Sequence, residues 1–524
     1  MRPFAAFAAA LLSLAAPAWA LADPVAIPVT IAPAAAPAPL SGRLIVFAQR
    51  VEPGAAPQTE IDSSPFAPTN TAVAAREVHA LASGQTALVD GEVDAFPSRF
   101  SELPAGTYRF QAVLDRNHDY NYGGRGAGDI VSPVVEARLP GAVPQLTLGE
   151  TLPERAPDAF LANVPEAERE ATRTAWGQTV EVDFASPKLS AFWGRPVHMR
   201  GWIALPPGYR ADGPTFPVAY STHGFGGSLR SQRVNAAQAI RRMAAGEWPP
   251  MIWVFLDQSS ATGTHEFADS VNNGPWGEAL TTELIPWLES RYRMDARPNG
   301  RFLTGHSSGG WATLWLQVRY PELFGGTWPT APDASDFHDF TNIDIYAPNA
   351  NAYRGADGTA LPLVRNEGRV AATLEQFARL ESVLGAYGGQ FASFDWVFSP
   401  KGPDGRPLQL FDRATGVIDP AVAAYWRDNY DIAHMLARDW ARLRPHLDGK
   451  IHVIVGTADT FYLDGSARRL QAVLDRLGAR ASFTYVDGGT HFSLYRPRPD
   501  GTDLMRDIAQ AMYAVARPGG RRVQ

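Results

Sequence analysis

The sequence predicts an α/β protein in which a doubly wound sheet follows an N-terminal β-sandwich. Two observations predict this arrangement. Short alternating segments, separated by turn residues and without convincing helices, fill the first part of the chain to about residue 150, as is typical of a β-sandwich. From Thr179 onward, continuous apolar runs alternate with helical patterns. Such alternation is typical of parallel strands that helices bury on both faces of a sheet.

Composition narrows the class of protein. The 524 residues are 45% hydrophobic and 19% charged, as in an ordinary globular protein with a sizeable core. A net charge of -7 argues against nucleic acid or an anionic membrane surface as the main partner. The chain has no cysteine, which excludes disulfides, thiolate metal sites and a cysteine nucleophile.

The N-terminus predicts export. Arg2 precedes an apolar run over Phe4–Ala16, and a small-x-small cleavage signal ends at Ala20. We expect a signal peptide over residues 1–22, cleaved after Ala20 or Ala22, and a periplasmic or secreted mature protein. The alternative is an uncleaved anchor, but the apolar run is short for a bilayer, and no other segment approaches the length of a membrane span.

Shifts in composition divide the remaining chain. A stretch within the sandwich, Leu103–Tyr108, resembles the prealbumin-like β-domains of exported proteins. Within the later insertion, the apolar spacing predicts helices over Arg369–Leu384 and Asp431–Leu443. The expected units are an Ala/Pro-rich leader (23–40), a prealbumin-like or Ig-like β-sandwich (41–150), a linker (151–175), an α/β domain (176–516) with a lid-like insertion (333–449), and a tail (517–524).

One motif predicts the nucleophile. The strand Arg301–Thr304 runs into Gly305-His-Ser-Ser-Gly309, and a helical pattern follows. A G-x-S-x-G sequence between a strand and a helix is the nucleophile elbow of α/β-hydrolases, in which a tight turn exposes the serine. Glycines are needed at the flanking positions because the turn leaves no room for larger side chains. Ser307 is therefore the predicted nucleophile.

A serine hydroxyl needs a base and an oriented imidazole to become nucleophilic. In this fold the acid and the histidine follow the serine in sequence, each on a loop after a strand. His491 meets that requirement, whereas His446 precedes a predicted strand and His452 lies inside it. Asp459 is the predicted acid; its competitor, Asp464, directly precedes a helical stretch and is better explained as a helix cap.

An acyl-transfer enzyme also needs donors for the oxyanion of the tetrahedral intermediate. The run Thr222–Gly227, which reads THGFGG, follows a strand and has the form of the loops that supply one backbone N–H. We expect the N–H of Phe225 to be this donor, with Gly226 in reserve. The second donor should be the N–H of Ser308.

Four segments in this order resemble the putative esterase family of α/β-hydrolases, which includes esterase D-like, feruloyl, acetylxylan and enterochelin esterases. They are Tyr220–Gly227, Asn273–Gly277 with Glu283–Pro286, Gly305–Gly310, and Gly456–Leu463 with His491. The resemblance implies hydrolysis of carboxylic esters, small or polymer-linked, without a metal or organic cofactor. It leaves the ester and the oligomeric state open. The alternatives are a prolyl-oligopeptidase-type peptidase, an acyltransferase, and a non-catalytic carbohydrate-binding or adhesion protein.

Weaker signals concern ligands. Asp115, Asn117, Asp119 and Asn121 place oxygen ligands at alternating positions, as calcium loops do. Position twelve of such a loop would be Gly126 instead of Glu, so an Asx-rich turn between strands is the alternative, and no other metal site is expected.

Some side chains near the predicted site have two interpretations. Asn273, Trp276 and Trp311 are weak candidates for contact with substrate, and packing is the alternative. The aromatic residues of the insertion, such as Trp426, are better explained as its own core than as a sugar-binding surface. A group of aspartates at the start of the insertion, which includes Asp333, is interpreted as a solvated loop.

Overall fold

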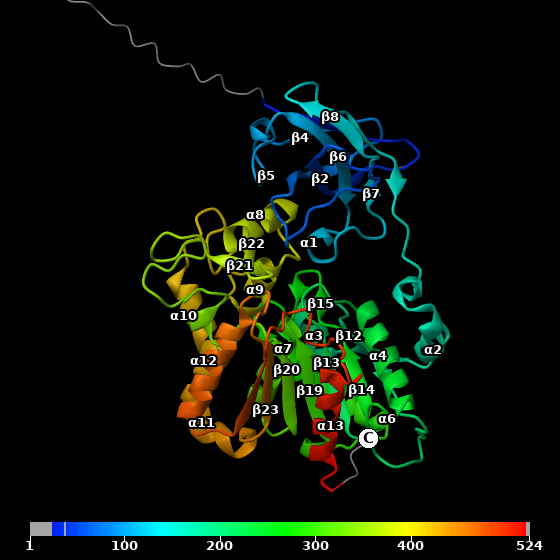
Figure 1. Ribbon diagram of the computed structural model, residues 1–524, viewed down its shortest axis with the longest axis vertical. Helices are drawn as coiled ribbons and strands as arrows, with labels where there is room; N and C mark the ends of the chain where they lie inside the picture. Colours follow the sequence, from blue (N-terminus) through cyan, green and yellow to red (C-terminus); the bar gives the residue numbers. More distant parts are fainter. Residues whose placement is uncertain (1–23, 36–37, 520–524) are drawn as a thin grey trace, which may run out of the picture.

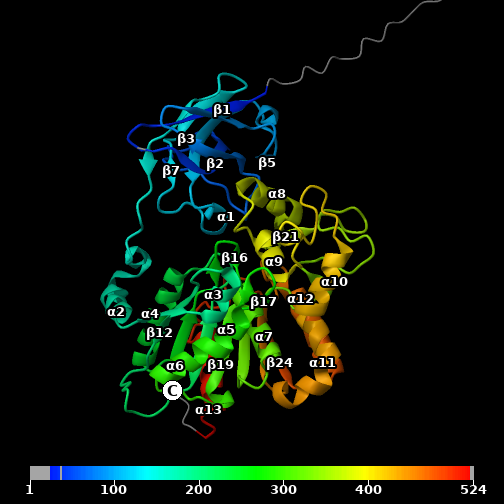
Figure 2. The same ribbon diagram turned by 180° about the vertical axis from the view of Figure 1, so that it is seen from behind.

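The computed structural model describes residues 24–35 and 38–519 and contains two domains of different class (Figures 1 and 2). A β-rich domain forms one end of the molecule, and a larger α/β domain forms the other. The predicted signal peptide lies outside the described residues. Within the described part of the chain, no helix is both long and apolar enough to cross a bilayer.

Two β-sheets form the N-terminal sandwich. The first has the order β4-β1-β9, and the second has the order β10-β7-β6-β2-β3-β5 with β8 paired to β6. Their bounds are β1 (Ala26–Ile31), β2 (Leu40–Arg50), β3 (Thr71–Leu81), β4 (Thr86–Asp90), β5 (Ala95–Phe96), β6 (Gly106–Asp115), β7 (Ile130–Val131), β8 (Val135–Leu139), β9 (Leu146–Leu148) and β10 (Glu150–Thr151). Because β1 pairs with both β4 and β9, the sandwich begins within the stretch predicted as a leader.

Strand β2 is buried on both faces. Its even-numbered side chains, Leu44 and Val46, pack into the interior of the sandwich. Its odd-numbered side chains, Ile45 and Phe47, pack instead against Val383 and other apolar residues of helix α8 (Leu374–Leu384). Successive side chains of a strand point to opposite faces, so one strand contributes to two cores and joins the two domains.

The α/β domain contains an eight-stranded sheet in the order β11-β12-β14-β13-β19-β20-β23-β24. The first three strands in this order pair antiparallel, and the remaining pairs are parallel. The strands are β11 (Val180–Ala185), β12 (His198–Ala204), β13 (Val218–Thr222), β14 (Ile252–Leu256), β19 (Arg301–His306), β20 (Gly326–Thr330), β23 (Ile451–Gly456) and β24 (Ala481–Val486). This topology confirms the predicted α/β-hydrolase fold.

Helices cover both faces of this sheet. Helix α13 lies over one face, in front of the sheet in Figure 1, and α5 and α6 lie over the other, in front of it in Figure 2. Besides α8, the helices are α1 (Tyr120–Gly123) in the β-domain, α2 (Glu166–Gly177) between the domains, and, in the α/β domain, α3 (Pro187–Trp193), α4 (Leu229–Ala244), α5 (Trp276–Ala279), α6 (Ile285–Arg291), α7 (Ser308–Arg319), α9 (Gln390–Phe398), α10 (Pro420–Tyr430), α11 (Ile432–Leu447), α12 (Leu463–Arg476) and α13 (Leu504–Ala516).

Short hairpins complete the domain: β15 (Ser259–Ser260) with β16 (Gly263–Thr264), β17 (Asp269–Ser270) with β18 (Gly274–Pro275), and β21 (Pro362–Asn366) with β22 (Arg369–Thr373). The segment between the domains is helical in part. Its helix α2 is bound to α4 through Arg241, which contacts Glu168 at 2.8 Å and Thr172 at 2.9 Å.

The insertion between β20 and β23 differs from its prediction at one helix. The helix expected over Arg369–Leu384 begins only at Leu374, because Arg369–Thr373 forms strand β22 and Thr373 caps the helix by accepting a hydrogen bond from the Gln376 N–H. Asp431 caps α11 in the same way. The buried aromatic residues Phe398 and Trp426, whose rings lie 5.1 Å apart, form part of the insertion's core, as predicted.

Candidate active site

Ser307 occupies a sharp turn between strand β19 and helix α7. Its backbone has φ 57° and ψ -125°, a conformation that costs a non-glycine residue about 1–3 kcal/mol and is retained where the surrounding structure enforces it. A Cβ atom at Gly305 would lie 2.2 Å from the carbonyl oxygen of Gly309. A Cβ atom at Gly309 would lie 2.5 Å from the carbonyl oxygen of His223. The two glycines of the motif are therefore required by close backbone packing.

Two loops after strands β23 and β24 bring His491 and Asp459 together. The Nδ1 atom of His491 lies 2.9 Å from Oδ2 of Asp459, and both side chains are almost fully buried. The other carboxylate oxygen of Asp459 accepts hydrogen bonds from the N–H groups of Phe461 (2.9 Å) and Leu463 (3.3 Å). The carboxylate is thus fixed on one side by its own loop and faces the imidazole on the other.

Asp464, the competing carboxylate, has another partner. It lies in the first turn of α12 instead of at the cap position, and Arg365 binds it at 3.0 Å. Of the two predicted carboxylates, only Asp459 contacts His491 among the hydrogen bonds of the described residues.

Another carboxylate, Asp333, contacts the nucleophile directly. Asp333 follows β20, the strand next to β19, and accepts hydrogen bonds from Ser307 Oγ (3.1 Å) and Ser308 Oγ (2.6 Å). Its prediction as part of a solvated loop is wrong, since the side chain is 5% exposed, and neighbouring Asp336 is equally buried. Burial raises the pKa of Asp333, although the hydrogen bonds from both serines and the charge of His491 oppose that shift.

Asp333 could have been found from the sequence by one argument. The carboxyl ends of adjacent parallel strands meet at the same edge of a sheet, and β19 and β20 are consecutive in the chain and in the sheet. A carboxylate three residues beyond β20 should therefore lie near the serine that follows β19. The further aspartates that follow it in the sequence favour a solvated loop instead.

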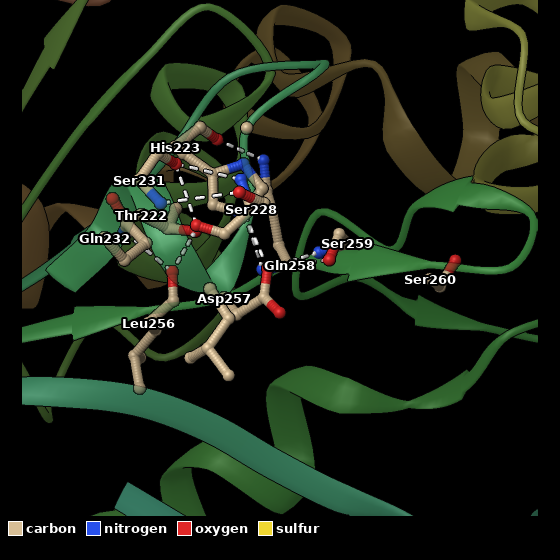
Figure 3. A network of polar contacts seen from close by, with 12 residues as sticks. Thr222, His223, Ser228, Ser231, Gln232, Leu256, Asp257, Gln258, Ser259 and Ser260 are labelled. Carbon is tan, nitrogen blue, oxygen red and sulfur yellow. Dashed lines mark hydrogen bonds and ion pairs between the residues drawn. The ribbon is translucent and has the colours of Figure 1, made fainter. Parts of the chain in front are cut away.

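The predicted oxyanion loop, which follows β13, is held by the side chain of His223 (Figure 3). Its Nε2 lies 2.8 Å from Oδ1 of Asp257 and 3.0 Å from the backbone nitrogen of Gln258, and its Nδ1 lies 2.7 Å from the carbonyl oxygen of Gly224. The Gln258 amide in turn donates to the His223 carbonyl oxygen. These contacts attach the loop to Asp257 and Gln258, which follow strand β14.

The loop runs directly beside the nucleophile. A Cβ atom at Gly224 would lie 2.9 Å from Cβ and 3.6 Å from Oγ of Ser307. Phe225 and Gly226, the predicted and reserve donors, line the same cavity as Ser307 and His491. Ser308 is the first residue of α7, where a backbone N–H has no acceptor within the helix. Both predicted donors thus lie next to the serine.

Ser307 lines two cavities of unequal size. The outer one has a volume of about 560 Å³, and His491 and Phe225 are in its wall. The inner one has a volume of about 40 Å³ and is lined mainly by apolar and aromatic side chains, with Asp333 as its only ionisable wall residue. Phe377 and Phe461 are in the walls of both.

The weak candidates for substrate contact lie elsewhere. Trp311 is fully buried, with its ring 4.7 Å from that of Phe398, so it is a core residue. Trp276 stacks on His265 with 3.5 Å between ring centroids, and Asn273 accepts a hydrogen bond from its indole. Trp276 and Asn273 line a different cavity from the two that Ser307 lines. Trp311 is thus packed in the core, whereas Trp276 and Asn273 lie away from the cavities at Ser307.

The calcium-type segment is only partly assembled. Asp115, Asp119 and Asp129 each bring one carboxylate oxygen within 4.8 Å of the others. Asn117 instead donates to the carbonyl oxygen of Ala127, and Asn121 donates to backbone carbonyls of the insertion. Burial, together with the nearby Asp115 and Asp119, raises the pKa of Asp129 to about 6, against the hydrogen bonds of Gly126 and Arg116.

The sheet order and the serine at the strand–turn–helix junction define the class: the protein has the α/β-hydrolase fold, with Ser307 at the position of the nucleophile elbow. The family follows from comparison. The model of the family described as "Putative esterase" matches residues 196–475, which is more than half of the chain. The protein belongs to this esterase family.

Known relatives and structures are similar to parts of the chain. Esterase MT1326 from Mycobacterium tuberculosis (strain CDC 1551 / Oshkosh) is 33% identical over 159 residues, which are 29% of this chain and 34% of that protein. The chain thus matches about a third of the length of this curated relative. A ferulic acid esterase structure is 14% identical, with a TM-score of 0.39, covering 65% of this chain and 97% of that one. An S-formylglutathione hydrolase (FrmB) from Staphylococcus aureus is 12% identical, with a TM-score of 0.39, covering 65% and 98%.

Proposed function

We propose that this esterase cleaves its substrate through an acyl-enzyme on Ser307, with His491 as the general base and Asp459 as the residue that orients the imidazole. The observation that carries the proposal is the buried 2.9 Å contact between His491 Nδ1 and Asp459, beside a cavity that His491 shares with Ser307. A carboxylate on Nδ1 keeps the proton on that nitrogen and leaves Nε2 free to accept one.

The reaction has two halves. Ser307 Oγ attacks the ester carbonyl carbon while His491 takes the hydroxyl proton, and the oxyanion accepts hydrogen bonds from the N–H groups of Phe225 and Ser308. Collapse of the intermediate breaks the bond to the alcohol oxygen, which leaves with the proton from His491. Water then attacks the acyl-enzyme with the same base, and the acid is released.

Asp333 has a separate place in this scheme. In the resting structure the Ser307 hydroxyl donates a hydrogen bond to Asp333. The hydroxyl must exchange this acceptor for His491 before it can attack. Because Asp333 also accepts from Ser308, its carboxyl keeps one partner when the Ser307 hydroxyl turns away.

The test of the nucleophile compares two serine variants on a short p-nitrophenyl ester. Ser307→Ala should lower kcat at least about 10⁴-fold, the scale seen when a triad member is removed. Ser290→Ala is the matched control, since Ser290 is exposed on α6 and its hydroxyl contacts the Trp287 carbonyl oxygen and the Arg291 side chain, both of its own helix. Wild-type activity in Ser307→Ala would refute the proposal.

We also propose that the protein is exported. The support is the basic, apolar and small-x-small pattern of residues 1–22. The full-length chain, expressed in a bacterial host, should appear in the periplasm or medium with Leu21 or Asp23 as its first residue, as read by N-terminal sequencing. A protein that keeps Met1 and stays in the cytoplasm would contradict this part of the proposal.

A further inference from the structure

The N-terminal β-domain supplies part of the wall around the nucleophile. Two of its segments line the outer cavity: the loop after β2, through Asp62 and Phe66, and the segment around α1, through Tyr120 and Tyr122. Ser307 is in the wall of the same cavity. The site is therefore enclosed by two domains, and the β-domain is more than an appendage to the catalytic one.

Tyr122 connects the β-domain to the oxyanion loop. Its hydroxyl donates a hydrogen bond of 2.7 Å to the carbonyl oxygen of Gly227. Its ring meets that of Phe225 edge-on, with 4.9 Å between centroids. His223 also binds this loop, so the loop is held by residues of both domains. A tyrosine in this position restricts where the N–H of Phe225 can point.

The β-domain is itself anchored where it meets the insertion. Arg43 donates to the carbonyl oxygen of Val383 from Nη2 (2.6 Å) and Nε (3.2 Å). Asn121, next to Tyr122, donates to the carbonyl oxygens of Glu381 (2.9 Å) and Gly385 (3.1 Å). An apolar cluster formed by both domains surrounds these bonds. The wall segments are thus held in place by α8.

Phe66 lies at the mouth of the outer cavity and is 44% exposed. Its ring lies 6.0 Å from that of Phe461 and 5.8 Å from that of Phe492, which is 62% exposed. Phe461 and Phe492 also contact the ring of His491, at 4.9 and 5.1 Å. Large aromatic rings left in solvent beside a catalytic base are typical of a ligand-binding surface.

The position of His491 distinguishes the two cavities. The base must return its proton to the alcohol oxygen as the alcohol leaves. His491 lines the outer cavity and is not part of the wall of the inner one. The alcohol therefore leaves into the outer cavity, and the acyl group occupies the inner one. With about 40 Å³, against the 10–15 Å³ or so that one water needs, the inner cavity admits only a compact acyl group.

We propose that the β-domain forms the alcohol-binding half of the active site, with Phe66 as a specificity-determining residue and Tyr122 as a positioning residue for the oxyanion loop, and that the preferred substrates are short-acyl esters of bulky alcohols with an apolar or ring face. This inference rests on the proposed function, because it uses His491 as the proton donor to the alcohol.

The experiment measures kcat and KM for methyl acetate, 1-naphthyl acetate and 1-naphthyl octanoate on the full mature chain. Wild type should prefer 1-naphthyl acetate over the octanoate by at least about 100-fold in kcat/KM, as expected when six extra methylenes cannot enter a pocket. Phe66→Ala should raise KM for 1-naphthyl acetate about fivefold, the scale of one lost aromatic contact, and change methyl acetate less than about twofold. Val93→Ala, another exposed apolar residue of the β-domain, is the matched control and should change neither.

Tyr122→Phe keeps the ring and removes the hydrogen bond to Gly227. It should lower kcat for both acetates by the same factor, about three- to tenfold, with KM unchanged and the unfolding midpoint lowered by no more than the loss of one hydrogen bond. Equal effects of Phe66→Ala on both acetates, equal rates for acetate and octanoate, or an unchanged kcat in Tyr122→Phe would each overturn the corresponding part of the inference. Activity in Ser307→Ala would instead overturn the proposed function, so the two failures are distinguishable.

Discussion

Replacing Asp459 with asparagine tests the most specific part of the site. The Oδ1 atom can keep its hydrogen bonds to the Phe461 and Leu463 N–H groups, so the loop should stay in place. The amide nitrogen then replaces Oδ2 and cannot accept the proton of His491 Nδ1. The imidazole should turn to the tautomer with its proton on Nε2, which cannot take a proton from the serine.

The magnitude follows from burial and charge. Asp459 is fully buried, and two unit charges about 4 Å apart in a medium of effective dielectric constant about 20 attract by about 4 kcal/mol. Losing that stabilisation of the imidazolium lowers kcat about 10³-fold, and the wrong tautomer adds about another factor of ten. We therefore expect Asp459→Asn to lose about 10⁴-fold in kcat, with KM within about threefold, in a stopped p-nitrophenyl acetate assay.

Two matched variants show whether the loss is specific to Asp459. Asp464→Asn weakens the ion pairs with Arg365 and Arg468 and should stay within about threefold of wild type, since partly exposed ion pairs contribute little. Asp333→Asn should lose less than about tenfold, because an amide oxygen can still accept from a serine hydroxyl. If Asp333→Asn lost more activity than Asp459→Asn, the assignment of Asp459 as the acid would be wrong.

Two further predictions concern the surroundings of the nucleophile. Gly224→Ala should lower kcat about 10²–10³-fold without unfolding the protein, because the new Cβ would lie 2.9 Å from Ser307 Cβ and displace the oxyanion loop. In the control Gly177→Ala the new Cβ meets nothing within 4 Å, so kcat should not change. Equal effects of the two substitutions would refute this interpretation. Burial lowers the pKa of His265 to about 3. Between pH 3 and about 6.5 the unfolded chain therefore binds a proton at this residue that the folded chain does not. As the pH falls through this range, His265 should lower the free energy of unfolding by up to about 1.4 kcal/mol per pH unit. The free energy of unfolding, measured by urea titration between pH 7 and 5, should depend less steeply on pH in His265→Gln, because one titrating group is lost. An unchanged dependence on pH would contradict this prediction.

Much of the site could be predicted because its signals are local. The elbow, the strand before it and the helix after it occupy one short segment, and the order of serine, acid and histidine is fixed by the fold. The positions of Asp459 and His491 followed from counting strands. Their contact in the structure needs no information beyond that order and the parallel arrangement of β23 and β24.

The rest could not be predicted because it depends on contacts between distant segments. Tyr122 reaches Gly227 across 105 residues, and nothing near either residue indicates that the two domains meet there. The helix expected from Arg369 begins five residues later for a local reason, since Thr373 caps it and the residues before the cap form strand β22. Trp311 follows the elbow, yet its helix turns it into the core, which proximity in sequence does not reveal.

Covalent labelling tests the central claim most directly. The full mature chain, treated with a fluorophosphonate and analysed by intact mass and peptide mapping, should gain one phosphonyl group, located on Ser307. Excess ester substrate should slow the labelling, and Ser307→Ala should remain unlabelled. A label on another residue, or none in a preparation that hydrolyses esters, would contradict the assignment of Ser307 as the nucleophile.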